Sequence, residues 1–397
     1  MSTQNHTAVI ISGARTPFAK INGSLASITA SELGAHAIKA ALEAGGVPAK
    51  AIDAVIMGQV IQAGSGQGPA RQASIGAGIG WDVPTVTINK LCLSGLTAVI
   101  DAARLIRAGD ARVVVAGGQE SMSNAPHLLL GSRKAHPYGS QQLEDAINYD
   151  GLVDPFEKLI MGEATDDGNA TRKISREAQD AFAAASHQRA ARSRAAGVFA
   201  EQIAPISVPQ RRGEPVLVSE DDGIRPDTTS ESLSRLRPAF RAAGTITAGS
   251  SSQLTDGAAA LVVASKDWAI ENGYEWIAEI GASGQVAGPD GSLHSQPANA
   301  IKQALAKEGT AVAALDVVEI NEAFASVVLQ SADDLDIDPA IVNVDGGAIA
   351  LGHPVGASGA RLALHLAYAL KRRGGGAGVV ALCGGGGQGE ALVLRVK

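Results

Sequence analysis

The chain has 397 residues, of which 45% are hydrophobic and 18% charged, and its formal net charge is −7. That length predicts two or three domain-sized units with a sizeable core, and the mixed charges include no long run of one sign that would mark a nucleic-acid-binding tail. No uncharged apolar stretch reaches the roughly 18 residues that a membrane span needs, and two cysteines in so long a chain argue against a disulfide scaffold and fit a reducing cytoplasm.

The first predicted elements belong to a repeated unit. A polar start, Met1–His6, leads into the apolar run Thr7–Ile11, which predicts a strand rather than a signal peptide. Residues 37–59 then predict an amphipathic helix, a glycine-containing turn and an apolar strand. Residues 300–322 align with residues 37–59 without a gap at an offset of 263, and nine of the 23 positions are identical. The chain therefore contains this unit twice.

The repeat continues around two Ser-Gly pairs, Ser94-Gly95 and Ser358-Gly359, which lie 264 residues apart. Each pair opens a predicted helix, and each helix leads through a glycine turn into an apolar strand. The helices are Leu96–Ala108 and Ala360–Arg373, and the strands are residues 112–118 and 378–384. Because strands alternate with helices, we expect a largely parallel, helix-covered sheet in each half and two halves packed about a pseudo-twofold axis.

Cys92 lies between the predicted strand Thr85–Ile88 and a predicted helix. At a helix N-terminus, free N–H groups and the helix dipole favour the thiolate, which is the form that acyl transfer needs. A free cysteine can instead be a small buried apolar residue. The strand–Cys–Ser-Gly–helix context favours a nucleophile over that alternative.

The segment from Met122 to Ser251 is more charged and richer in turns than the two repeats. Such an excursion from a repeated scaffold predicts an inserted lid or binding loop. Within it, residues 174–195 predict a helix. Leu128, Leu129 and Leu130 indicate either a contact patch between subunits or the buried face of a helix.

Two polar residues stand out in the second half. Asn321 ends the second copy of the repeated strand, where the first copy has Gly58, and it indicates either a buried polar group with partners or a turn. His353 lies in the glycine-dense segment 346–359, just before a predicted helix, which suggests backbone held close to a ligand. We interpret His353 as the base that takes the proton of Cys92.

Cys383 ends the last repeated strand and is followed by four glycines, residues 384–387. It is either an incidental thiol in a flexible turn or a second reactive thiol. In the second case, the bare backbone N–H groups beside it can donate to an oxyanion where side chains would obstruct.

These four motifs, around Cys92, Asn321, His353 and Cys383, together resemble the thiolase family over the whole chain. Further matching segments are residues 13–18, 236–240, 244–249 and 256–260. The resemblance is nearest to bacterial members that condense acetyl-CoA. It implies an α/β fold in which an α/β/α layered unit is duplicated and carries an inserted lid. The implied domains are residues 1–121 with 252–274, the lid and coenzyme-A-binding segment 122–251, and residues 275–397.

The resemblance implies a ping-pong Claisen reaction catalysed by an acetyl-CoA C-acetyltransferase. Cys92, assisted by His353, is acetylated by acetyl-CoA, and Cys383 takes a proton from the methyl group of a second acetyl-CoA. The enolate attacks the acetyl-cysteine and gives acetoacetyl-CoA and coenzyme A. His353 and a water held by Asn321 stabilise the enolate oxygen, and the N–H groups of Cys92 and Gly385 form a second oxyanion hole.

The resemblance also assigns the substrate contacts. Arg225 matches a position beside the adenine, Ser252 one near the pantetheine, and Met161 a lid contact near the thioester. Acetyl-CoA, acetoacetyl-CoA and coenzyme A are the expected partners, with no further cofactor, no metal and a homotetrameric assembly. Residues 163–167 and 288–297 depart from the family pattern near the acyl pocket, which leaves the acyl chain length open.

Three alternatives remain. A degradative 3-ketoacyl-CoA thiolase for longer chains shares every predicted catalytic residue. A decarboxylating ketosynthase of the same fold lacks a second catalytic cysteine, so the pairing of Cys92 with Cys383 argues against it. A non-catalytic acyl-CoA or lipid carrier has no physical need for both thiols together with His353 and Asn321.

Overall fold

One long mixed β-sheet runs through the chain, and the computed structural model describes residues 7–134 and 138–397. The prediction that no signal peptide precedes the first strand concerns residues 1–6, which lie outside the described part. In the first half the strands are β1 (Ala8–Arg15), β2 (Ala19–Lys20), β3 (Ala54–Gly58), β4 (Thr85–Ile88), β5 (Val113–Ser121) and β10 (Thr255–Ser265). In the second half they are β11 (Ala278–Ala287), β12 (Val317–Ile320), β13 (Gly376–Gly384) and β14 (Gln388–Val396).

The strand order is β12-β13-β14-β11-β1-β10-β5-β3-β4, with β2 added beside β10. The two halves join where β1 pairs with β11, through Val9 opposite Glu279 and Ile10 opposite Ala278. The order of strands on one side of this junction mirrors the order on the other. The duplicated fold predicted from the repeat is therefore confirmed, as two half-sheets joined edge to edge.

The expected parallel sheet is wrong. Only β3 with β4, β3 with β5, and β12 with β13 pair in parallel, whereas the other neighbours run antiparallel. One reason is that β14 follows β13 without a helical crossover, while the other antiparallel neighbours on the main strand path are strands that do not follow one another in the chain. Between β13 and β14 the chain turns back at once through Gly386 and Gly387, whose φ angles of 70° and 65° suit a tight hairpin turn.

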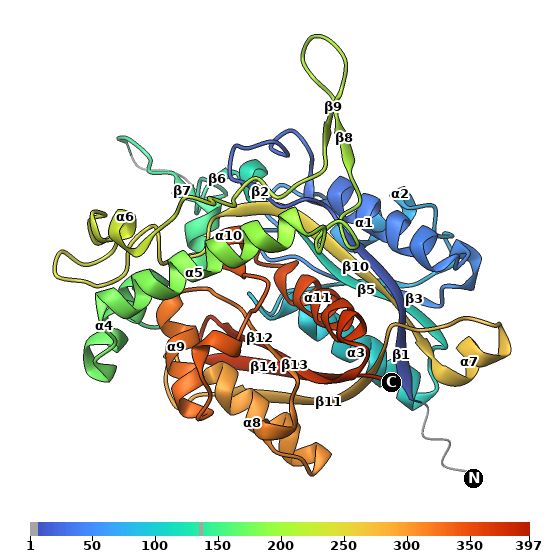
Figure 1. Cartoon of the computed structure of the whole chain (residues 1–397). Helices are drawn as coiled ribbons and strands as arrows, with labels where there is room; N and C mark the ends of the chain where they lie inside the picture. The colour runs from blue at the N-terminus through green and yellow to red at the C-terminus, as the bar shows by residue number, and fades with distance from the viewer. Residues whose placement is uncertain (1–6, 135–137) are drawn as a thin grey trace.

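Helices form three layers around the two half-sheets (Figure 1). Helix α1 (Ala30–Gly45) covers the outer face of the first half-sheet and α8 (Gln296–Glu308) that of the second, while α3 (Ser94–Ala108) and α11 (Ser358–Arg373) lie between them. The remaining helices of the two halves are α2 (Pro69–Gly76), α7 (Lys266–Glu271), α9 (Ala325–Asp334) and α10 (Ala348–Leu351). The α/β/α layering expected for each half is thus present.

The repeated glycines set the helix ends. Gly46 and Gly309, which are equivalent in the two copies, adopt left-handed φ angles of 63° and 64° and end α1 and α8. At the other end, the Thr29 side chain and Glu32 form a capping box at the start of α1. A shared glycine therefore ends the helix at the equivalent residue in both halves.

The central helices approach each other at the two Ser-Gly pairs. A β-carbon on Gly359 would lie 2.3 Å from the backbone nitrogen of Leu96, and one on Gly95 would lie 2.8 Å from the carbonyl oxygen of Gly356. Only glycine permits such backbone contact. The N-termini of α3 and α11, with the turns that precede them, are thereby held together at the centre of the molecule.

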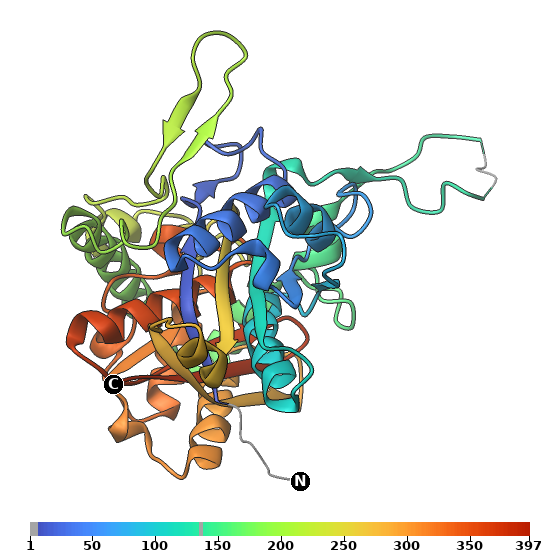
Figure 2. The same ribbon diagram turned by 90° about the vertical axis from the view of Figure 1, so that its right-hand side faces the viewer.

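The inserted segment carries small elements of its own. These are β6 (His127–Leu128), β7 (Glu144–Asp145), α4 (Met161–Arg172), α5 (Arg176–Ala195), β8 (Ile206–Val208), β9 (Val216–Val218) and α6 (Ser230–Ser234). Helix α5 confirms the predicted helix at 174–195, and the β8–β9 hairpin projects from the body (Figure 2). Leu129 and Leu130 are exposed and lie outside any helix, so the buried-helix alternative for residues 128–130 is wrong.

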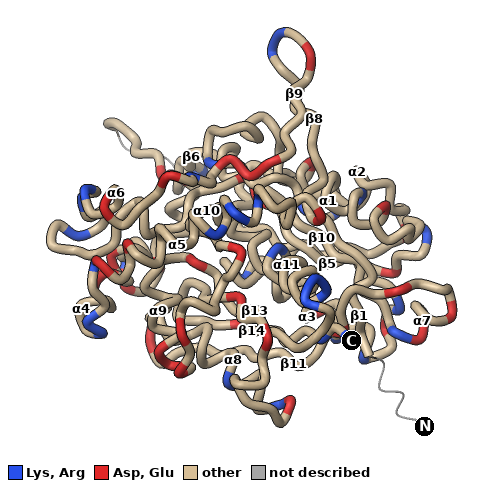
Figure 3. Tube along the Cα trace, viewed as in Figure 1, with Lys and Arg blue, Asp and Glu red and all other residues tan. Residues whose placement is uncertain are grey.

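Charges of both signs are interspersed over the periphery (Figure 3), which fits the mixed charges of the sequence. Among the described residues, no helix is both long enough and apolar enough to cross a bilayer.

Candidate active site

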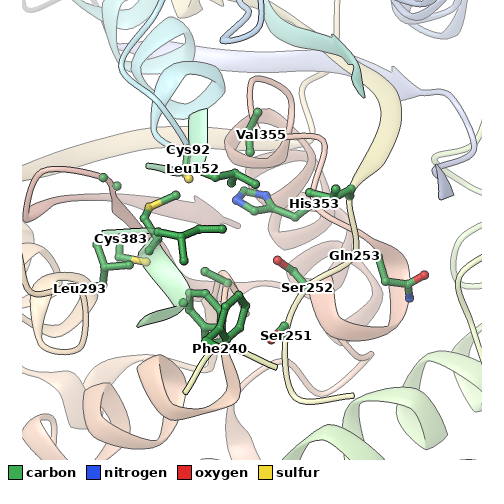
Figure 4. A pocket seen from close by; sticks show the side chains of 18 of the residues that line it. Cys92, Leu152, Phe240, Ser251, Ser252, Gln253, Leu293, His353, Val355 and Cys383 are labelled. Atoms are coloured by element: carbon green, nitrogen blue, oxygen red, sulfur yellow. The ribbon is translucent and has the colours of Figure 1, made fainter. Parts of the chain in front are cut away.

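A cavity of about 310 Å³ opens between the two halves and the inserted segment (Figure 4). Its volume lies in the usual range for a small-molecule site. Six of the eight predicted site residues line it: Cys92, Met161, Ser252, His353, Cys383 and Gly385. Sequence positions almost 300 residues apart therefore meet at one site.

The nucleophile candidate Cys92 is carried by a tight turn between β4 and α3. Leu91 has a φ of 52°, in the left-handed region that a leucine seldom adopts. The Ser94 hydroxyl holds this turn, because it accepts from the Lys90 N–H at 2.8 Å and donates to the Leu91 carbonyl at 2.6 Å. The turn thus directs Cys92 into the cavity, where only 5% of the residue is exposed.

The backbone N–H groups at Cys92 do favour the thiolate, as expected, but burial has the larger effect. Burial raises the pKa of Cys92 to about 11, and it outweighs the backbone N–H groups of Cys92 and Gly385, which lower the pKa. The negative charge of Glu120 raises the pKa further. Even so, both N–H groups of the predicted oxyanion hole act on the same sulfur.

His353 is held in one orientation and one tautomer. The Ser358 hydroxyl donates to the Pro354 carbonyl at 3.0 Å, so it accepts from Nδ1 of His353, which lies 2.5 Å away. Nδ1 then carries the ring proton and Nε2 keeps its lone pair. Burial and the charge of Arg361 lower the pKa of His353 to about 3, so the ring is neutral at pH 7.

Asn321 lies behind the histidine rather than in the cavity wall. Its Nδ2 atom is 3.4 Å from Nε2 of His353, and the residue is fully buried at the end of β12. The turn alternative does not apply to a side chain that contacts the ring. Its carbonyl oxygen has no hydrogen-bond partner among the described residues.

Cys383 and Gly385 lie on the β13–β14 hairpin, and both line the cavity that Cys92 lines; Figure 4 shows the side chains of Cys92 and Cys383 there. Burial raises the pKa of Cys383, and a negative charge on Cys92 raises it further, so the two thiols titrate as a coupled pair. A β-carbon at Gly385 would lie 2.7 Å from Cδ1 of Leu91. The glycine run therefore lets the hairpin backbone approach the turn that carries Cys92.

The predicted substrate contacts divide between the cavity and the surface. Met161 starts α4, and the Ser252 N–H donates to the Ala323 carbonyl at 3.0 Å, which fixes this edge of the cavity. Arg225 is exposed and lies outside the cavity wall, where its N–H donates to Nδ1 of His187 at 3.2 Å.

The two segments that depart from the family pattern differ in their position relative to the cavity. Leu293, from the segment 288–297, lines the cavity, whereas none of residues 163–167 does so. Instead, the Asp166 carboxylate accepts from the N–H groups of Thr245 and Ile246, at 2.8 and 3.0 Å. The segment 163–167 thus contacts the loop at 245–246, and of the two segments only 288–297 reaches the cavity, through Leu293.

Two residues that act on Cys92 or His353 were not identified from the sequence. Glu120 is the last residue but one of β5, is fully buried, and accepts from the N–H groups of Val60, Ile61 and Gly356 at 2.9 to 3.1 Å. Burial raises its pKa to about 7. A carboxylate near the end of a strand that begins as an apolar run was the available signal. Ser358, which orients His353, had its signal in the repeated Ser-Gly pair.

A second buried carboxylate, Glu319, lies two residues before Asn321 on β12. Burial raises its pKa to about 8, although the nearby charge of Arg361 lowers it. The equivalent residue in the first copy, 263 positions earlier, is Ile56. The second half thus carries a titratable group where the first half is apolar.

Known proteins with this architecture were found by sequence and by structure. Family models described as "Thiolase, N-terminal domain" and "Thiolase, C-terminal domain" match residues 8–267 and 274–396. A Mycobacterium tuberculosis protein named "Probable acetyl-CoA acetyltransferase" is 58% identical over 389 residues, which cover 98% of this chain and 99% of that protein.

Two solved structures superpose almost completely. The crystal structure of the Bacillus anthracis acetyl-CoA acetyltransferase gives a TM-score of 0.96 at 38% identity and covers 99% of this chain and 100% of that one. The crystal structure of human mitochondrial 3-ketoacyl-CoA thiolase gives 0.95 at 38% identity and covers 99% of both chains. The likeness of the fold therefore extends to proteins named for different substrates.

Proposed function

This chain belongs to the thiolase family of acyltransferases, and we propose that it is an acetyl-CoA C-acetyltransferase, which condenses two acetyl-CoA into acetoacetyl-CoA and coenzyme A and catalyses the reverse thiolysis. One observation carries the proposal. A thiol, an unprotonated imidazole nitrogen and a second thiol, those of Cys92, His353 and Cys383, line one cavity, and all three residues are buried.

The first half reaction uses Cys92 and His353. Nε2 of His353 takes the thiol proton as Cys92 attacks the thioester carbon of acetyl-CoA, and the imidazolium returns that proton to the departing coenzyme A. The N–H groups of Cys92 and Gly385 lower the pKa of this sulfur and would stabilise the oxyanion beside it. Burial keeps both groups neutral in the free enzyme, so the charged pair forms only with substrate bound.

The second half reaction uses Cys383. Its proton passes to His353, the thiolate removes a methyl proton from a second acetyl-CoA, and the imidazolium donates from Nε2 to the enolate oxygen. The enolate carbon then attacks acetyl-Cys92, and the sulfur that leaves regains the proton from His353. Asn321, 3.4 Å from Nε2, would hold a water against the same oxygen through its free carbonyl.

The inserted segment would bind coenzyme A, with Met161 near the thioester, Ser252 along the pantetheine arm and Arg225 at the adenine. The exposed position of Arg225 outside the cavity suits a contact to the distal end of a long substrate. Leu129 and Leu130, both exposed, would contribute to assembly of the predicted homotetramer. Light scattering after size-exclusion chromatography tests that assembly.

A second candidate, a 3-ketoacyl-CoA thiolase for longer chains, is favoured by the almost equal likeness to the human 3-ketoacyl-CoA thiolase. Thiolysis of acetoacetyl-CoA and of a long-chain 3-ketoacyl-CoA by free coenzyme A, at matched concentrations, separates the two. We expect turnover of acetoacetyl-CoA and little of the long chain. A preference for the long chain would assign the second function. Turnover of neither by folded, reduced protein would favour the carrier.

A further inference from the structure

One fully buried carboxylate near the site has no part in the reaction described above. Glu390 lies on β14, directly opposite Leu382 and next to the pair formed by Gly389 and Cys383. It does not line the cavity. A charge in such a position is costly unless it is paired and hydrogen-bonded.

Both oxygens of Glu390 have partners from other elements. Oε1 accepts from Nζ of Lys90 at 3.0 Å and from Nε2 of Gln285 on β11, and Oε2 accepts from the hydroxyl of Thr97 on α3 at 2.7 Å. The amide of Gln285 is itself oriented, because its carbonyl oxygen accepts from Arg104 on α3 at 2.7 Å. The carboxylate is therefore satisfied by a fixed set of donors.

These partners lie on both sides of the nucleophile. Lys90 precedes Cys92 by two residues and forms a bridge with it across the turn, and Thr97 lies in the first turn of the helix that follows. Glu390 itself belongs to the hairpin that carries Cys383 and Gly385. One side chain thus ties the Cys92 turn to the strand pair that holds the other thiol and the second oxyanion donor.

We propose that Glu390 is a positioning residue, which through Lys90 and Thr97 fixes the Cys92 turn against the β13–β14 hairpin and so sets the alignment of the Cys92 sulfur with the Gly385 N–H. The left-handed Leu91 in this turn needs such an external restraint. This role rests on the proposed function, in which the Gly385 N–H stabilises the oxyanion.

Glu390→Gln tests the role, because an amide cannot neutralise Lys90 and presents a donor where Lys90 or Thr97 also donates. We expect kcat for acetoacetyl-CoA thiolysis to fall by about 10-fold or more with KM nearly unchanged, since a small misalignment costs rate and Glu390 lies outside the cavity. Glu279→Gln is the matched control. Glu279 lies on β11 outside the cavity wall, and its carboxylate accepts from Nζ of Lys266 on α7 at 2.7 Å, so the kcat of this variant should equal that of the wild type.

The double variant Lys90→Met/Glu390→Gln removes both charges and avoids a lone buried ion if the single variant folds poorly. It should show the same loss of kcat. Normal kcat in either folded variant, or an equal loss in Glu279→Gln, would overturn the positioning role. Alkylation of Cys92 by iodoacetamide, located by mass spectrometry, reports on the turn without turnover. In the double variant, whose local charge is balanced, its pH profile should move to higher pH because the sulfur loses its alignment with the Gly385 N–H.

The two proposals can fail separately. A wild type that turns over no 3-ketoacyl-CoA would overturn the proposed function, while an altered alkylation profile in the double variant would still support the restraint on the turn. An active wild type whose variants keep the wild-type kcat and alkylation profile would overturn the positioning role alone.

Discussion

The turn before α3 and the turn before α11 occupy equivalent places in the two halves, yet the serines that follow them have different hydrogen-bond partners. Ser94 bonds only to backbone, at Lys90 and Leu91, and shapes the turn that carries a thiol. Ser358 also bonds to backbone, because its hydroxyl donates to the Pro354 carbonyl, but its oxygen in addition accepts from Nδ1 of His353. The duplicated scaffold thus supplies the proposed nucleophile from one copy and its proposed proton acceptor from the other.

The two halves also differ at the end of the repeated strand. A β-carbon on Gly58 would lie 2.7 Å from the Gly356 carbonyl oxygen, so the first half has no room there for a side chain. The equivalent position in the second half holds Asn321, in contact with His353. The second half therefore provides most of the candidate catalytic side chains, while the first half provides Cys92 and closely packed backbone.

The largest effect should follow from removing the thiol of either half. Cys92→Ala should lower thiolysis by more than about 10³-fold, because the covalent intermediate is lost. Cys383→Ala should still accept one acetyl group from acetyl-CoA, detectable as a mass increase on Cys92, while condensation ceases. Acetylation of Cys383 in the Cys92→Ala variant would show that the division of labour is wrong.

The next largest effect should follow from a substitution at the backbone contact between the two halves. Gly359→Ala puts a β-carbon against the Leu96 backbone, which cannot move aside as a flexible side chain would, and should reduce the free energy of unfolding by about 3 kcal/mol. Gly46→Ala is the control. It meets open space and should cost about 1 kcal/mol for its left-handed φ alone. Urea denaturation measures both, and equal losses would contradict a close contact at Gly359.

Glu319, whose equivalent in the first half is Ile56, should make the free energy of unfolding depend on pH. Its folded pKa of about 8 lies above the ordinary value of 4.5, so the stability it contributes is full below pH 4.5 and is lost as the pH rises through 8. Relative to Glu319→Gln, the wild type should lose about 3.5 kcal/mol between pH 5 and pH 8. Urea midpoints at the two pH values measure this, and a constant difference would exclude a raised pKa.

The smallest effects should separate the two serines. Ser358→Ala removes the acceptor that fixes the His353 tautomer and should lower kcat by about 10-fold, with a changed pH–rate profile. Ser94→Ala loses two backbone hydrogen bonds and should cost about 1 kcal/mol in unfolding free energy. If Ser358→Ala changed stability but left the pH–rate profile intact, Ser358 would be structural like Ser94.

Much of this molecule could be predicted from local pattern. The repeat, the helices at 94–108 and 358–373, and the strand ends that carry Cys92, Asn321 and Cys383 follow from hydrophobic period and glycine stops. Strand direction could not be predicted, because it depends on whether a turn such as 384–387 reverses the chain. The pKa of Cys92 was equally beyond the sequence, since it depends on how deeply the folded halves bury the sulfur.

The position of β1 has a consequence for how this chain is made. It is the first strand of the described chain, all its residues are buried, and both its neighbours, β10 and β11, come about 250 residues later. At ribosomal rates of about 5–20 residues per second, this apolar strand waits roughly 12–50 seconds for its partners to be synthesised. Nascent chains therefore expose it throughout most of translation, and their yield should depend on chaperones that shield apolar segments.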